Sequence, residues 1–159
     1  MGWPTISIVS GGFDPVHIGH VRLFKEARKL GNELWVILNN DNWLIAKKGF
    51  VFMPEQERKE ILEAIKWIDY VFITEHDSNP SDMSVCKDLE KLAKYYKDEL
   101  KFDLLFCNGG DRKEGNVPEY ELCEQCGITM MFGLGGEKIQ SSTKLARKAT
   151  NSRTVLECK

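Results

Sequence analysis

Short apolar runs and longer amphipathic stretches alternate along this chain. Each apolar run is rich in Val, Ile, Leu and aromatic residues, which is typical of a strand buried in a sheet. The runs that fit this description cover residues 5–9, 33–38, 70–74, 102–106 and 128–132. We therefore expect five strands.

The segments between these runs show helical spacing of apolar residues. In the clearest, from Ile18 to Leu30, apolar positions lie three apart, and Gly31 follows as a suitable helix C-cap. Pro54 suits the first position of another helix. Further helices are expected within 85–96 and 118–126, and a last one from about 141 to 149. Residues 39–53 are expected to form a polar, lysine-containing loop, and residues 151–159 a tail.

Strands that alternate with helices imply right-handed crossovers and a parallel sheet. We therefore expect an α/β fold: a Rossmann-like, doubly wound, five-stranded parallel sheet in a single domain over residues 1–150, followed by a C-terminal tail over 151–159. In such a sheet, ligands bind at the carboxyl ends of the strands, near the point where the strand order reverses.

Composition narrows the class of protein. The chain has 159 residues, of which 42% are hydrophobic and 29% charged, as in soluble globular proteins. The net charge of −2 disfavours nucleic acid as the main partner. We find no apolar run of about 18 residues for a membrane span. The five cysteines are odd in number and irregularly spaced, which favours reduced thiols and, without a signal peptide, a cytoplasmic protein.

Candidate chemistry is concentrated between the first strand and the first helix. Gly11 and Gly12 allow backbone N–H groups to approach a phosphate without a side chain in the way. The following helix directs its positive end to the same place. His17 and His20 lie three apart on one helix face, and Gly19 keeps the helix surface low where a nucleotide would lie. This pattern predicts a site for the triphosphate of a nucleotide.

The run G-x-F-D-x-x-H-x-G-H from Gly11 to His20 resembles the signature of the HIGH-motif nucleotidyltransferases, which include glycerol-3-phosphate cytidylyltransferases and heptose-1-phosphate adenylyltransferases. Further landmarks follow in the family's order, over about 135 residues in all. They are the lysines Lys47 and Lys48, Pro54-x-x-x-Arg58, Asn108-Gly109-Gly110-Asp111 and Ser141-Ser142-Thr143-Lys144-Leu145.

The resemblance implies transfer of a nucleotidyl group from an NTP, with CTP slightly favoured, to a small sugar or polyol phosphate. Pyrophosphate would be released, Mg²⁺ would assist, and the chain would form a homodimer. The catalytic residues would be His17, His20 and Lys47, with Arg58 and Lys47 binding the acceptor and no protein side chains binding a metal. The nucleotide would contact Gly11, Gly12, Phe13, Asp14, Gly19, Gly109, Asp111, Ser141, Ser142 and Thr143.

Several alternatives stay open at this point. Cytidylyltransferases have an arginine where this chain has Gly136, and Lys138 or Arg112 is a candidate to replace it. An adenylyltransferase that uses ATP on a heptose phosphate or a pantetheine-type acceptor fits the same motifs, as does a nucleotide-binding module without catalysis. Arg58 could instead form a plain ion pair on its helix. His76, in an acidic loop, is expected to be solvated.

Overall fold

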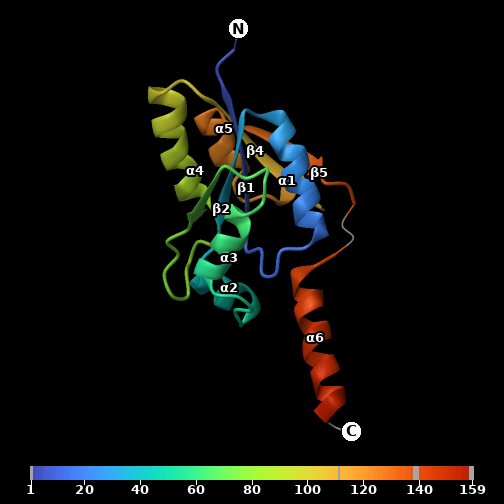
Figure 1. Ribbon diagram of the computed structural model, residues 1–159. Coiled ribbons are helices and arrows are strands. Elements are labelled where there is room, and N and C mark those ends of the chain that lie inside the picture. Colours follow the sequence, from blue (N-terminus) through green and yellow to red (C-terminus); the bar gives the residue numbers. More distant parts are fainter. Residues whose placement is uncertain (1, 111, 138–139, 158–159) are drawn as a thin grey trace.

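Five parallel strands form the centre of the computed structural model, which describes residues 2–110, 112–137 and 140–157 (Figure 1). Their order across the sheet is β3-β2-β1-β4-β5, and every neighbouring pair is parallel. The strands are β1 (Thr5–Gly11), β2 (Glu33–Leu38), β3 (Tyr70–Ile73), β4 (Asp103–Gly109) and β5 (Thr129–Leu134). The doubly wound parallel sheet predicted from the sequence is thereby confirmed.

Helices cover both faces of this sheet. They are α1 (Ile18–Leu30), α2 (Asp41–Lys48), α3 (Glu55–Glu63), α4 (Cys86–Leu92), α5 (Tyr120–Cys126) and α6 (Ser142–Glu157). A π-helical segment (Ala93–Glu99) extends α4, and a 3₁₀ turn (Glu114–Asn116) precedes α5. On one face α1 and α3 pack through Phe24 and Leu62, and on the other α4 and α5 pack through Leu89 and Cys123. Each face of the sheet therefore has its own apolar core.

Three elements differ from the sequence-based expectation. Residues 41–48, expected in a loop, form α2, because the Asn40 side chain caps its start and Gly49 adopts the left-handed conformation at its end. Strand β4 continues through Cys107 to Gly109, because both pair with β5. Helix α6 continues past residue 150 into the expected tail and extends away from the body of the protein (Figure 1).

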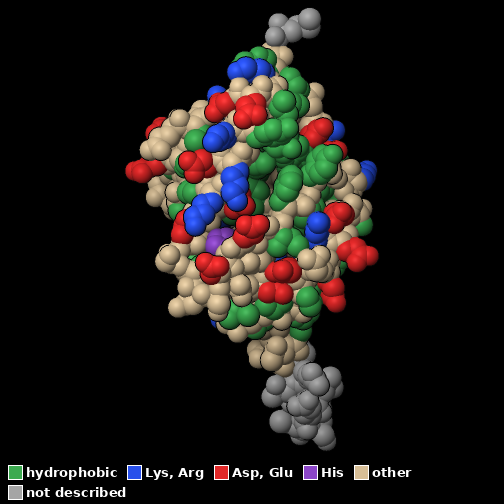
Figure 2. All heavy atoms as spheres, turned by 90° about the vertical axis from the view of Figure 1, so that its left-hand side faces the viewer, with side chains coloured by type: hydrophobic (Ala, Val, Ile, Leu, Met, Phe, Trp, Pro, Cys, Tyr) green, Lys and Arg blue, Asp and Glu red, His purple; other side chains and the backbone are tan. Residues whose placement is uncertain are grey.

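The β3 edge of the sheet carries exposed aromatic side chains. Tyr70 is 55% and Phe72 37% exposed, and their rings contact that of Trp35 on β2. Figure 2 shows the side of the molecule that lies at the left of Figure 1, where basic and acidic side chains are intermixed around a hydrophobic area. No helix within the described ranges has the length and apolar character that a membrane crossing requires.

The strand order places the candidate residues together. The order reverses between β1 and β4, so the loops that follow these two strands leave in opposite directions and open a crevice at their carboxyl ends. The loop after β1 leads to α1, and the segment after β4 leads to α5. Residues that are distant in sequence therefore meet at one edge of the sheet.

Candidate active site

A cleft of about 340 Å³ lies at this edge, lined by segments from β1, α1, α2, β4, the loop after β5 and the start of α6. Most of the residues predicted from the sequence line it together. These are Gly11, Gly12, Phe13, His17, Gly19, His20, Lys47, Gly109, Ser141, Ser142 and Thr143. Three do not: Asp14 and Arg58 lie outside the lining, and Asp111 lies outside the described residues.

The two histidines cap the first turn of α1. Nδ1 of His17 accepts a hydrogen bond from the backbone N–H of Gly19 (3.1 Å), and Nδ1 of His20 accepts from the backbone N–H of His17 (3.2 Å). The rings stack with centroids 3.7 Å apart. Because Nδ1 of each ring accepts, a neutral imidazole carries its hydrogen on Nε2. The fold therefore selects the tautomer that offers an Nε2–H donor on both rings.

His20 stays neutral in this environment. Its pKa is lowered from 6.5 to about 3, chiefly by burial and to a smaller extent by the charges of His17 and Lys48. Phe13 contributes to the burial, because its ring packs edge-on against the His20 ring with centroids 4.9 Å apart. At neutral pH the His20 side chain is thus a hydrogen-bond donor without charge.

Gly19 makes room for the His17 ring. A Cβ atom at position 19 would lie 2.9 Å from Cε1 and 3.1 Å from Nδ1 of His17. The expectation was that this glycine leaves space for a nucleotide. In the structure, the imidazole of His17 occupies the space directly beside it, so a side chain here would displace the ring.

The last turn of α2 supplies two cations to the cleft. The Lys47 ammonium lies 5.4 Å from the centroid of the Trp43 ring, an arrangement that favours a cation. Lys48 is half-buried, and burial lowers its pKa; Asp14 opposes this shift, whereas Arg58 and Lys47 add to it. Of the two lysines, Lys48 is the more enclosed, although Lys47 was the one assigned a catalytic role from the sequence.

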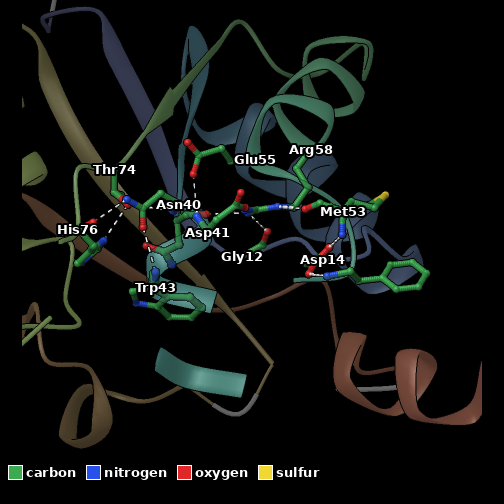
Figure 3. Close-up of polar contacts among 12 residues, drawn as sticks. Gly12, Asp14, Asn40, Asp41, Trp43, Met53, Glu55, Arg58, Thr74 and His76 are labelled. Carbon is green, nitrogen blue, oxygen red and sulfur yellow. Dashed lines mark hydrogen bonds and ion pairs between the residues drawn. The ribbon is translucent and has the colours of Figure 1, made fainter. Parts of the chain in front are cut away.

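Arg58, predicted to bind the acceptor phosphate, is fully buried among protein groups (Figure 3). Its Nε donates to the carbonyl of Met53 (2.8 Å), and Nη1 donates to the carbonyls of Gly12 (2.8 Å) and Asn39 (2.6 Å). Nη2 forms an ion pair with the Asp41 carboxylate at 2.7 Å. The guanidinium therefore joins the loop after β1, the end of β2, the start of α2 and the segment before α3.

Asp14, like Arg58, is buried and forms its hydrogen bonds with protein backbone groups. Its buried carboxylate accepts from the backbone N–H groups of Phe52 (2.7 Å) and Met53 (2.6 Å). These bonds fix the segment between α2 and α3 against the loop that contains the histidine motif. Asp14, predicted to contact the nucleotide, thus has the contacts of a residue that orders the loop.

The remaining wall comes from the C-terminal half of the chain. Ser142, at the start of α6, donates its hydroxyl hydrogen to the carbonyl of Pro15 at 2.7 Å, which ties α6 to the histidine loop. Arg112 also lines the cleft, and its Nη1 lies 3.4 Å from Oδ1 of Asn108. Of the two candidates to replace the missing arginine, Arg112 thus borders the cleft, and Lys138 is outside the described residues.

Sequence reasoning gave no site role to several lining residues. Leu23 and Leu134 supply apolar surface, and Glu137 and Gln140 line the cleft near α6. Leu23 gave no distinct signal in the sequence, because an apolar residue on a helix predicts core packing as readily as a ligand contact. Among residues 2–110, 112–137 and 140–157, no cluster of three or more His, Cys, Asp or Glu side chains could hold a metal ion.

Residues 8–111 match the model of the cytidylyltransferase-like family. The chain belongs to this family. Both the fold and the order of the motifs agree with the resemblance seen in the sequence. The match covers the histidine motif, both lysines of α2, and Arg58.

Several relatives of this cytidylyltransferase-like chain are named FAD synthases. The one from Archaeoglobus profundus is 29% identical over 94% of this chain and 97% of its own length. That from Thermococcus kodakarensis is 39% identical over 42% of this chain, but this spans only 45% of the relative. The bifunctional protein HldE of Syntrophotalea carbinolica is 34% identical over 77% of this chain and 22% of its own length.

A solved structure of similar fold is the bifunctional NMN adenylyltransferase/ADP ribose pyrophosphatase of Francisella tularensis. It superposes with a TM-score of 0.62 at 18% identity, over 93% of this chain and 42% of that one. At this identity the likeness concerns the fold alone. It places the cytidylyltransferase-like chain among α/β proteins that share its sheet.

Proposed function

We propose that this chain is a nucleotidyltransferase that moves a nucleotidyl group from an NTP to the phosphate of a small acceptor. The observation that carries the proposal is the pair of stacked, capped imidazoles that share one cleft with two lysines. Two Nε2–H donors, the N-terminus of α1 and two ammonium groups form an environment for a polyphosphate.

The chemistry needs no activated side chain. An oxygen of the acceptor phosphate attacks the α-phosphorus, the bond from the α-phosphorus to the bridging oxygen of the β-phosphate breaks, and pyrophosphate leaves with the bonding electrons. The attacking phosphate is anionic at neutral pH, so no general base has to remove a proton. Catalysis then consists of positioning the reactants and stabilising the charge that develops.

Each group in the cleft has a place in this scheme. His17 and His20 donate Nε2–H bonds to phosphate oxygens as charge builds up on them. Lys47 and Lys48 neutralise the two phosphates that approach each other. Residues 141–143, at the start of α6, hold the β- and γ-phosphates. Mg²⁺ stays a proposed cofactor, and we expect triphosphate oxygens and water molecules to be its main ligands, because this ion usually keeps several waters when it binds a nucleotide.

The names of the relatives favour ATP as donor and FMN as acceptor. FAD consists of FMN joined to an adenylyl group, so an FAD synthase performs the reaction written above with these two substrates. The name of the full-length relative from Archaeoglobus profundus supports this pair. CTP with a polyol phosphate, slightly favoured by the sequence, is the alternative, and a heptose phosphate with ATP is supported by the likeness to HldE.

The test is pyrophosphate release with Mg²⁺, each of ATP, CTP, GTP and UTP, and FMN, a heptose 1-phosphate or glycerol 3-phosphate as acceptor. ATP with FMN is expected to give pyrophosphate and FAD in equal amounts. Turnover with another pair would identify that pair as the substrates and would leave the proposed class of reaction unchanged. Nucleotide binding without turnover for any pair would identify a non-catalytic binding module instead.

Variants of the two histidines then test the site. In His17→Asn and His20→Asn, a side-chain oxygen can still accept the capping hydrogen bond, but the Nε2–H donor is lost. We expect each variant to lower kcat by a factor of about 10² while folding normally, as for the loss of one oxyanion donor. A loss of less than about threefold in both would refute the role given to the histidines.

A further inference from the structure

Helix α2, which carries both lysines, is held to the protein by its first turn. It has eight residues, too few to be stable as an isolated helix. Trp43 and Leu44 are buried, whereas the residues that follow, from Ile45 to Lys47, are exposed. Over eight residues the helix is about 12 Å long, so a tilt of about 10° at its start moves its far end by about 2 Å. The contacts of the first turn therefore determine where the lysines enter the cleft.

Asn40, the N-cap of α2, uses its polar groups to fix this turn (Figure 3). Its side-chain Oδ1 accepts from the backbone N–H of Trp43 (3.0 Å), which is the capping bond itself. Its Nδ2 donates to the backbone carbonyl of His76 (2.9 Å), and its backbone N–H donates to Oγ1 of Thr74 (3.1 Å). The cap is therefore oriented by the segment that follows β3.

For a neutral His76 ring, the hydrogen bonds of that segment have one consistent direction. Nε2 of His76 lies 3.1 Å from the carbonyl oxygen of Ser84, which can only accept, so Nε2 carries the hydrogen. In the neutral ring Nδ1 is then the acceptor, and the Thr74 hydroxyl, 2.8 Å away, is its donor. The chain of donors thus runs from Asn40 N–H to the Thr74 hydroxyl and on to His76. His76, expected to be solvated, is in fact held at both ring nitrogens.

We propose that Thr74 and His76 are positioning residues for the lysines of α2. Neither lines the active-site cleft. They act through Asn40, whose orientation they fix, and the cap in turn sets the direction of α2 and the entry of Lys47 and Lys48. This inference rests on the proposed function, because it assigns those lysines to the approaching phosphates.

A second anchor keeps the helix in place when this one is lost. The backbone N–H of Asp41 donates to the Glu55 carboxylate (2.7 Å), and the Asp41 carboxylate pairs with Arg58. Removal of the Thr74 hydroxyl should therefore tilt α2 about the Asp41 contacts instead of unfolding it. Variants at Thr74 and His76 can then be studied in the folded protein.

Matched pairs of variants test the proposal. Thr74→Val removes the hydroxyl and Thr74→Ser keeps it. His76→Asn keeps an acceptor near the position of Nδ1, whereas His76→Gln keeps a donor for Ser84 and loses the acceptor for Thr74. With the nucleotide and acceptor that support turnover, we expect kcat to fall by about tenfold to a hundredfold in T74V and H76Q. This is the loss expected when a group that positions the reactants moves by about 1–2 Å. T74S and H76N should stay within about threefold of wild type.

The decisive comparison uses a protein without the two lysines. If Thr74 acts by placing them, T74V should have no further effect on kcat in a Lys47→Met, Lys48→Met background. A loss in this background as large as in the wild type would overturn the proposal, because Thr74 would then act on something else.

Hydrogen exchange gives a readout that does not depend on turnover. Amides of residues 43–48 should exchange faster in T74V and H76Q than in T74S and H76N, with α1 unchanged in all four. Equal exchange in α2 across the variants would refute the anchoring role. If the wild type shows no turnover with any substrate pair, the proposed function fails, and exchange alone still decides whether Thr74 and His76 anchor α2.

Discussion

Replacing Arg58 by methionine would test whether this side chain supports the fold or binds substrate. The change keeps a long side chain but removes the donors that now satisfy the carbonyls of Met53, Gly12 and Asn39. Each unsatisfied buried carbonyl costs about 1–3 kcal/mol. The Asp41 carboxylate, 35% exposed, can turn to water and adds little. We therefore expect the free energy of unfolding to fall by about 3–5 kcal/mol.

Urea unfolding followed by circular dichroism measures this change directly. For a chain of this length, a loss of 3 kcal/mol corresponds to a decrease in Tm on the order of 10 °C. Lys59→Met is the matched control, because it removes a cation from the same helix without depriving a buried carbonyl of its hydrogen-bond donor. It should change the free energy of unfolding by less than about 0.5 kcal/mol. If R58M were as stable as this control and raised KM for the acceptor, Arg58 would bind the acceptor phosphate and our interpretation would be wrong.

Three further predictions concern the cleft. Lys48→Met should lower kcat more than Lys47→Met, because Lys48 is the more enclosed of the two. Steady-state kinetics of both variants measures this, and a larger loss in Lys47→Met would contradict the greater role given to Lys48. Gly19→Ala should lower kcat by about tenfold by displacing the adjacent imidazole, whereas Gly115→Ala, with open space around its Cβ, should not change it. Stability should fall as the pH decreases from 6.5 towards 3, because the unfolded chain binds a proton that His20, with its pKa of about 3, does not. Thermal unfolding against pH should show this slope, at most about 1.4 kcal/mol per pH unit, and His20→Asn should reduce it.

The fold and the histidine motif were predictable because their signals are local. Strand and helix periodicity lie within single segments, and the run from Gly11 to His20 combines its glycines and histidines in ten residues. The parallel, doubly wound arrangement then follows from general rules on the connections between strands and helices. Most of the correct predictions therefore came from patterns within short segments of the chain.

What was missed depends on contacts between distant segments. The sequence could not show that the Arg58 guanidinium meets the carbonyl of Gly12, 46 residues away, or that His76 orients the cap at Asn40. Helix α2 was missed for a different reason, because its polar residues outweighed the apolar pair Trp43 and Leu44. A local signal was present in Asn40 and Gly49, which suit the two ends of a short helix.

Because His17 and His20 form capping bonds as well as lining the cleft, selection for stability and selection for activity both act on them. A member of this family that had lost its activity would still gain stability from both imidazoles, since a helix cap is worth about 1 kcal/mol. The cations at the end of α2 benefit the fold less, because Lys47 is exposed, with a contact to the Trp43 ring, and because burial of Lys48 disfavours its charged form. During evolutionary decay we therefore expect the lysines to disappear before the histidines. For distinguishing active from inactive descendants, α2 is then a better diagnostic than the histidine motif.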